Sequence, residues 1–204
     1  MRKIKAYKDK LYRQKKRYLF LSSIVVVGLI TGVVYFLYLS NDNQKLIFAH
    51  LETLFETIKN NKIDYSTSII NGIISNLLNC SIIWLLGISI IGIPIVIFIL
   101  FYHAFVVGLT ISSIIGCYKL KGVLVAIIYV FPHKILFLTI NVLLVFYSIS
   151  FSIKLIRYLF FKVNINFKDS FRKYLKILAV SLSLFVFLSL YECFIVPFFL
   201  KTIV

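Results

Sequence analysis

The residues from Tyr65 to Tyr118 form a stretch of 54 residues without Lys, Arg, Asp or Glu. A helix that crosses the roughly 30 Å hydrocarbon core of a bilayer needs about 20 apolar residues, so this stretch is long enough to cross it twice. Between the two crossings lie Gly87, Gly92 and Pro94. Gly permits backbone angles that other residues avoid, and Pro lacks an N–H, so these residues favour a turn. The stretch therefore predicts a hairpin of two membrane helices.

The second helix of this hairpin, about residues 94–116, has a small residue at every fourth position, which places these residues on one face. The first, about residues 68–86, has a polar face at the same spacing, formed by Asn71, Ser75 and Asn79. Membrane helices associate through close packing of small residues and through interhelical hydrogen bonds. We expect the two matching faces to hold the bundle together, and a substrate path lined by Asn and Ser is the alternative. The small residues are Ala104, Gly108, Ser112 and Gly116.

The rest of the chain is also apolar. Of its 204 residues 61% are hydrophobic, and the mean hydropathy is +0.98, which excludes a soluble domain of this size. An uncharged run of 21 residues, Leu19 to Leu39, would be about 31 Å long as a helix. Its apolar part is too long for a cleaved signal peptide, so we expect an uncleaved signal anchor. The composition predicts an all-α integral membrane protein.

Two further apolar runs follow the hairpin. Gly122 lies in a predicted short loop, and the run from Val123 to Ile153 is interrupted at Pro132, which removes a backbone hydrogen bond. This run is either one kinked, tilted helix or a short re-entrant half followed by a full span. The last span is expected at about residues 177–200 and includes Pro197. The chain is therefore predicted to be a bundle of about five transmembrane helices.

The charges predict the topology of these spans. The formal net charge is +16, but 16 of the 23 Lys and Arg lie in residues 1–18 and 154–176, next to apolar spans. This pattern follows the positive-inside rule and does not indicate nucleic-acid binding. Five spans put both basic segments in the cytoplasm, together with the N-terminus, and the C-terminus outside. We expect a cytoplasmic N-terminus at 1–18, an anchor at 19–39, an extracytoplasmic loop at 40–66 and a membrane domain at 67–204.

The extracytoplasmic loop contains an amphipathic segment. Apolar residues recur at the helical period over about residues 46–58, with Asp42 or Asn43 as a possible N-cap. Glu52 and Glu56 lie one turn apart on this helix. The helix could lie on the outer surface of the bilayer or of the bundle. Alternatively, Glu52 and Glu56 belong to a docking surface for an extracytoplasmic partner.

Four ionisable residues lie within the predicted spans: His103, His133, Lys134 and Glu192. Such residues are costly in a bilayer and are therefore candidates for a functional site. An unpaired carboxylate at Glu192 should find a partner, and we expect contact with Lys134 or His133. This contact is either a structural clamp or part of transport or partner control. The sequence shows no catalytic or metal-binding motif, so we expect neither an enzyme nor a cofactor.

The order of several short motifs resembles the stage II sporulation protein M family. Three segments resemble its hairpin, two resemble its Gly-containing loop and proline break, and one is similar to its terminal Glu-x-x-x-x-Pro motif. Many members have Pro-Gln-Asn where this chain has Pro-His-Lys at 132–134. The segments are, in that order, 84–87, 91–94 and 105–110, then 121–124 and 131–133, and finally 192–197.

The resemblance implies a role in engulfment during endospore formation. Members of the family are understood to anchor two peptidoglycan hydrolases, stage II sporulation proteins D and P, at the septal membrane of a sporulating bacterium. The resemblance therefore implies a non-enzymatic scaffold that takes part in cell-wall remodelling and contacts membrane lipids and these partners. A permease subunit of a membrane transporter is the alternative, because a broken helix and intramembrane ionisable residues also occur in transporters.

Overall fold

The computed structural model describes residues 2–60, 64–161 and 166–200 and, within these ranges, most side chains. This part of the chain forms helices and no strands. Five of its helices contain a segment long and apolar enough to cross a bilayer, which confirms the predicted all-α membrane fold. The helices are α1 (Arg2–Tyr38), α2 (Asn41–Lys59), α3 (Tyr65–Ile88), α4 (Gly92–Tyr129), α5 (Phe131–Phe161) and α6 (Phe167–Leu200).

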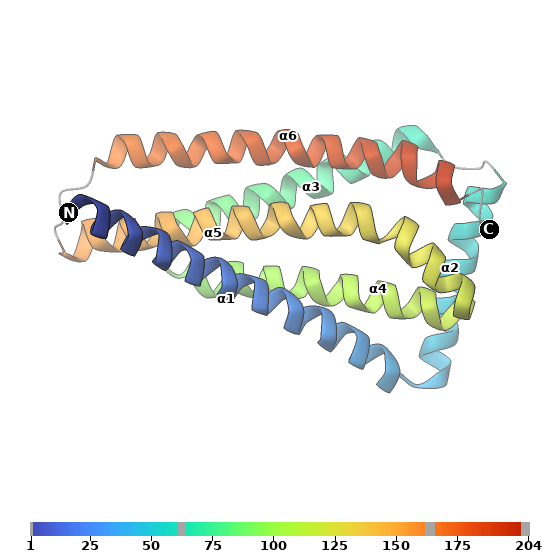
Figure 1. Cartoon of the computed structure of the whole chain (residues 1–204). Coiled ribbons are helices and arrows are strands. Elements are labelled where there is room, and N and C mark those ends of the chain that lie inside the picture. Colours follow the sequence, from blue (N-terminus) through green and yellow to red (C-terminus); the bar gives the residue numbers. More distant parts are fainter. Residues whose placement is uncertain (1, 61–63, 162–165, 201–204) are drawn as a thin grey trace.

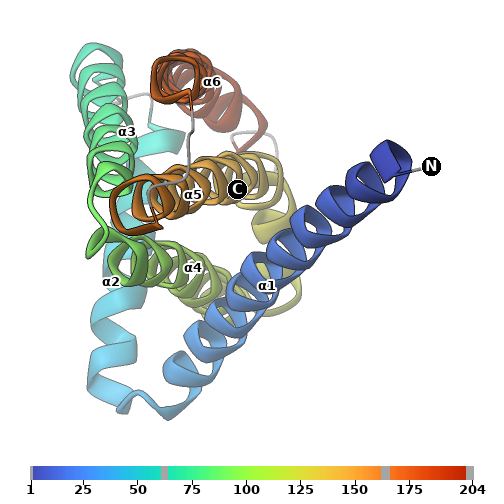
Figure 2. The same ribbon diagram turned by 90° about the vertical axis from the view of Figure 1, so that its left-hand side faces the viewer.

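The five long helices run along one axis, and α2 crosses one end of them (Figure 1). α5 packs against α1, α3, α4 and α6, and the view along the bundle shows it among them (Figure 2). α1 begins at one end of the bundle and α6 ends at the other (Figure 1). We call the end with α2 the α2 end and the opposite end the basic end, because the described parts of the two basic segments, 1–18 and 154–176, lie on that side.

The hairpin of α3 and α4 has a shorter turn than the sequence predicts. Helix α3 continues through Gly87 to Ile88, and α4 begins at Gly92. Gly87 is buried inside α3, where Ser152 Oγ on α5 donates a hydrogen bond of 2.6 Å to its carbonyl oxygen. A Cβ on Gly92 would overlap the carbonyl group of Leu86, so this tight turn requires Gly at position 92. Pro94 lies in the first turn of α4, where the missing N–H costs no helical hydrogen bond.

The short loop predicted around Gly122 is instead a sharp bend inside α4. Lys119 has φ 51° and ψ −125°, in a region that non-glycine residues rarely adopt. The chain turns back at this point and brings Gly122 against Ile115. A Cβ on Gly122 would lie only 2.9 Å from the Cα of Ile115. A short helical segment then leads to α5, and Pro132 lies in the first turn of that helix. The run from Val123 is therefore a short helical segment followed by a long helix, and the re-entrant position of the short segment stays a prediction.

The face of small residues on α4 packs against α1, and its predicted match with the polar face of α3 is wrong. A Cβ on Gly28 would lie 2.8 Å from the Cβ of Ala104, and one on Gly108 would overlap the backbone of Leu29. Gly116 lies against the ring of Phe36 in the same interface. Ser112 is buried there too, and its hydroxyl donates to carbonyl oxygens of its own helix. Close contact between the two backbones explains why α1 packs most extensively on α4.

Helix α2 packs its apolar side on the α2 end of the bundle. It begins after Ser40, which takes the N-cap position predicted for Asp42 or Asn43. Phe55 is buried, and its ring meets that of Tyr118 edge-on at 5.3 Å between centroids. Glu52 and Glu56 are exposed.

Candidate functional site

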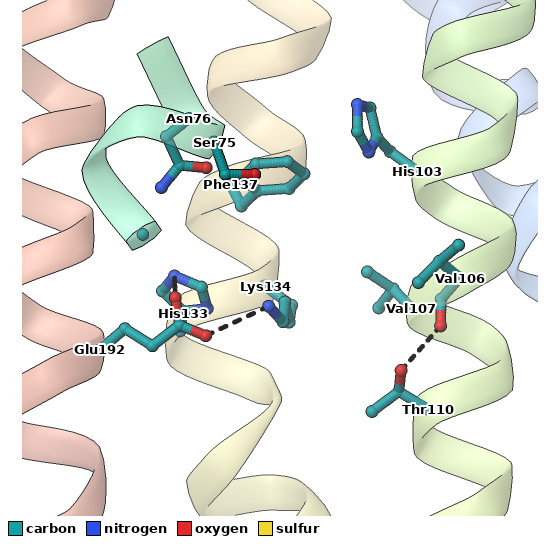
Figure 3. A pocket seen from close by; sticks show the side chains of 11 residues that line it. Ser75, Asn76, His103, Val106, Val107, Thr110, His133, Lys134, Phe137 and Glu192 are labelled. Atoms are coloured by element: carbon teal, nitrogen blue, oxygen red, sulfur yellow. Dashed lines mark hydrogen bonds and ion pairs between the residues drawn. The ribbon is translucent and has the colours of Figure 1, made fainter. Parts of the chain in front are cut away.

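Helices α3, α4, α5 and α6 enclose a polar cavity of about 350 Å³. Helices α3, α5 and α6 contribute residues from the half that lies nearer the α2 end, where α3 and α5 begin and α6 ends (Figure 1), and α4 contributes residues 103–110 near its middle. Side chains from all four helices point toward this space (Figure 3). The lining residues are Gly72, Ser75, Asn76, His103, Val106, Val107, Thr110, His133, Lys134, Phe137 and Glu192.

Glu192 on α6 contacts two consecutive residues of α5. Its Oε1 lies 3.3 Å from Nζ of Lys134, and its Oε2 lies 3.0 Å from Nε2 of His133 (Figure 3). The His133 side chain is 3% exposed, and those of Lys134 and Glu192 are 27% and 32% exposed. Despite this short distance to Oε2, Nε2 of His133 has no hydrogen-bond partner among the described residues. Both contacts expected from the sequence are present.

The arrangement explains how a carboxylate is accommodated in an apolar span. A charge in low dielectric needs a close opposite charge or hydrogen-bonding partners. Lys134 supplies the opposite charge, and Glu192 in turn compensates the ammonium group of Lys134. Because Lys134 lies one turn from the start of α5 and its side chain is only partly buried, its long side chain keeps some access to the end of the bundle. The pair links α5 to α6.

A second set of polar side chains lies at the side of the cavity that faces the basic end. Nε2 of His103 lies 2.8 Å from Oδ1 of Asn79, and Nδ2 of Asn79 donates to Oδ1 of Asn141 at 2.9 Å. Nδ2 of Asn141 donates to the carbonyl oxygen of Phe137, also at 2.9 Å. With the amides oriented this way, the proton of His103 that faces Asn79 is on Nε2. These bonds join α4, α3 and α5 in one layer.

Beyond this layer the bundle is filled with apolar side chains toward the basic end. Fully buried residues of α3, α4, α5 and α6 form one cluster there, and α1 adds Leu21. The cavity therefore does not continue along the bundle axis toward the basic end. The residues of this cluster with the lowest exposure are Cys80, Ile83, Val96, Leu100, Leu144, Val145 and Phe185.

The sequence identifies His103, His133, Lys134 and Glu192, and the structure places all four around one cavity. It does not identify Asn141, whose only signal is an amide in the middle of an apolar run. Glu52 and Glu56 on α2 are not among the lining residues, so the predicted docking pair is a separate surface. The predicted break at Pro197 lies inside α6, but its side chain is outside those that the structure describes.

Comparison with known proteins identifies the family of the chain. A family model described as stage II sporulation protein M matches residues 20–197. This range includes the cavity, the whole of α2, α3, α4 and α5, the second half of α1 and all but the last residues of α6. No curated protein and no solved structure matches the chain.

Proposed function

Because the chain belongs to the stage II sporulation protein M family, we propose that it is a non-enzymatic membrane scaffold for endospore engulfment. In this proposal it anchors two peptidoglycan hydrolases, stage II sporulation proteins D and P, at the septal membrane. The basic end faces the cytoplasm, and the α2 end faces the compartment that contains the cell wall. The family membership supports the process, and the distribution of charge between the two ends of the bundle supports the orientation.

The docking surface that we propose is the outward side of α2, with Glu52 and Glu56. Leu51, Phe55 and Ile58 are packed against the bundle, so they are not available to anchor α2 in lipid. This packing is the observation that favours a docking role over a helix that only lies on the bilayer. It holds the two exposed carboxylates in a fixed position at the proposed outer end.

The test is co-purification of the two hydrolases with the tagged full chain from sporulating cells. We expect both hydrolases to co-purify with the wild-type chain, and Glu52→Lys with Glu56→Lys to reduce their recovery at least several-fold. Asp169→Lys is the matched control, because Asp169 is an exposed carboxylate at the basic end. Equal loss with Asp169→Lys would contradict docking on α2. Failure of the wild-type chain to retain either hydrolase would contradict the anchoring role itself.

The polar cavity supports a second candidate function, a permease subunit. It reaches the layer of His103 and Asn79, and polar groups at such depth are common along substrate pathways. Transport also requires that the apolar cluster beyond this layer open toward the basic end. In a chain whose three native cysteines are replaced, Leu100→Cys should react with a membrane-impermeant thiol reagent from the cytoplasmic side if the protein is a permease. The scaffold predicts no reaction there.

A further inference from the structure

One side of α5 remains uncovered although α5 packs against four other helices. Leu136, Leu143 and Tyr147 follow one another at helical spacing and are 48%, 39% and 38% exposed. Seen along the bundle, α1 and α6 lie on different sides of α5 (Figure 2). The uncovered side of α5 is thus bordered by α1 on one flank and by α6 on the other.

Two apolar grooves run along this side of α5. The first, of about 390 Å³, lies between α5 and the Tyr18–Leu29 segment of α1. The second, of about 250 Å³, lies between α5 and the Lys176–Leu184 segment of α6. Leu143 lines both grooves and separates them. The two grooves therefore lie side by side on the surface, one on each side of the Leu143 side chain.

The length of the first groove corresponds to one leaflet of a bilayer. The 11-residue rise from Tyr18 to Leu29 spans about 16 Å of helix, close to half of the roughly 30 Å hydrocarbon core. Both grooves begin where a basic segment meets an apolar span, with Tyr18, the last residue of 1–18, in one and Lys176, the last residue of 154–176, in the other. The first groove therefore extends from one membrane interface to about the middle of the bilayer, and the second, along Lys176–Leu184, covers about 12 Å of the same depth.

The groove openings at the basic end contain cations. Lys176 lines the second groove together with Tyr147, and Nη1 of Arg17 donates to Oγ of Ser150 on α5 at 3.4 Å. Lys173 lies one turn before Lys176, on the same side of α6. Within the described part of the chain, the ion pairs involve residues of α2, α5 and α6 near the α2 end and none of these three cations. Their positive charge remains available to an external anion.

We propose that this side of α5 binds one anionic glycerophospholipid, with an acyl chain in each groove and its phosphate beside Lys176 and Arg17. Two chains match two grooves divided by Leu143, whereas a partner helix, about 10–12 Å across, would need one continuous trough. The positive charge at the openings selects an anionic headgroup over a zwitterionic one. The site is independent of the proposed docking surface on α2.

The experiment measures displacement of a fluorescent phosphatidylglycerol from the purified full chain in detergent micelles. Unlabelled phosphatidylglycerol should compete at least ten times better than phosphatidylcholine with the same acyl chains. Lys176→Gln should weaken phosphatidylglycerol binding about fivefold, since a basic residue at a membrane surface contributes about 1 kcal/mol. Lys121→Gln is the matched control, because Lys121 lies on α4 at the α2 end of the bundle, and it should have no effect.

Leu143→Trp tests the grooves without changing charge. A larger ring at this position fills the space on both sides of Leu143, so we expect at least a tenfold loss of binding. Val180→Trp is a second test in case Leu143→Trp fails to fold. Val180 is exposed on α6 and lines only the second groove, so a Trp there obstructs that groove alone and should also weaken binding. Equal competition by the two lipids would overturn the proposal. Full binding by both Trp variants, or equal effects of Lys176→Gln and Lys121→Gln, would show diffuse electrostatic attraction and overturn the site.

Discussion

Replacing Gly32 by Ala tests whether direct backbone contact between α1 and α4 stabilises the bundle. A Cβ at this position would lie 2.8 Å from the backbone nitrogen of Leu109 and would overlap the carbonyl oxygen of Phe105. Since ordinary contacts begin at 3.4 Å, the helices must separate locally by at least about 0.6 Å, the difference between the two distances. A gap of this size removes a quarter to a half of each neighbouring dispersion contact. Overpacking of this kind costs about 1–3 kcal/mol, and we expect that loss in the free energy of unfolding.

Gly72→Ala is the matched control. A Cβ on Gly72 would meet only the Ser189 side chain, at an ordinary contact distance of 3.8 Å. Because Ala is favoured over Gly inside a helix by about 0.5–1 kcal/mol, this variant should be as stable as the wild type or slightly more stable. The assay is unfolding by SDS in mixed micelles, followed by circular dichroism. If Gly32→Ala unfolds at the same SDS fraction as Gly72→Ala, close packing of α1 on α4 does not stabilise the bundle.

Three further predictions concern the polar groups. Glu192→Lys or Lys134→Glu alone should cost about 3 kcal/mol in the same SDS assay, because each leaves like charges in a partly buried site, and the double exchange should recover part of this loss. Asn79→Leu breaks two hydrogen bonds of the layer below the cavity and should cost about 1–3 kcal/mol. At the N-terminus of α3, Thr67 donates to Asp64 from its hydroxyl and its backbone N–H and lowers the pKa of that carboxyl. This cap is therefore formed above the ordinary pKa of Asp and is lost as the pH falls through the lowered value, which hydrogen exchange at Thr67 would detect.

Each of these predictions has a control. Asn71, in the same helix as Asn79 but exposed, should tolerate Leu with little change, and an equal cost at both sites would mean that the hydrogen bonds are not responsible. A double exchange of Glu192 and Lys134 that is no more stable than either single variant would show that the two charges do not interact. Asp64→Asn should remove the pH dependence of exchange at Thr67, and persistence of that dependence would assign it to another group.

The number and positions of the spans could be predicted because hydrocarbon imposes a single requirement, a long uncharged run. The ends of the helices could not be predicted in this way. α1 extends back through the basic segment to Arg2, and α6 begins at Phe167, well before its apolar part. A helix that leaves the bilayer retains its internal hydrogen bonds, and Lys and Arg are good helix formers. Hydropathy therefore marks the membrane boundary and not the end of the helix.

The partner of the small residues on α4 shows a second limit of sequence periodicity. Spacing of four residues defines a face, but it does not say which helix that face meets. Neighbours in sequence usually pack together, and this rule favours α3, the other helix of the hairpin. The close approach instead occurs with α1, where Gly28 and Gly32 also lack a side chain. Two complementary faces of this kind allow closer backbone contact than one small face against Asn and Ser side chains.

The candidate site was predictable to the extent that its residues are charged. Glu192 and Lys134 lie at the same depth in adjacent antiparallel spans, and a charge in hydrocarbon requires a partner, so their contact follows from topology. The chain of His103, Asn79 and Asn141 does not follow in the same way. An uncharged amide can be satisfied by its own backbone, by another helix or by water, and the sequence does not distinguish these partners.

The filled half of the bundle also bears on the choice between scaffold and permease. A path from the cavity to the basic end would have to expose side chains such as Leu100, Leu144 and Phe185, each of which is fully buried. At about 1.5–3 kcal/mol for each large apolar side chain, exposing these three costs on the order of 6 kcal/mol. A substrate could supply this energy only by binding the open state that much more tightly, which corresponds to a preference of about 10⁴-fold. Anchoring a partner at the α2 end requires no such second state, and the closed bundle favours the scaffold for this reason.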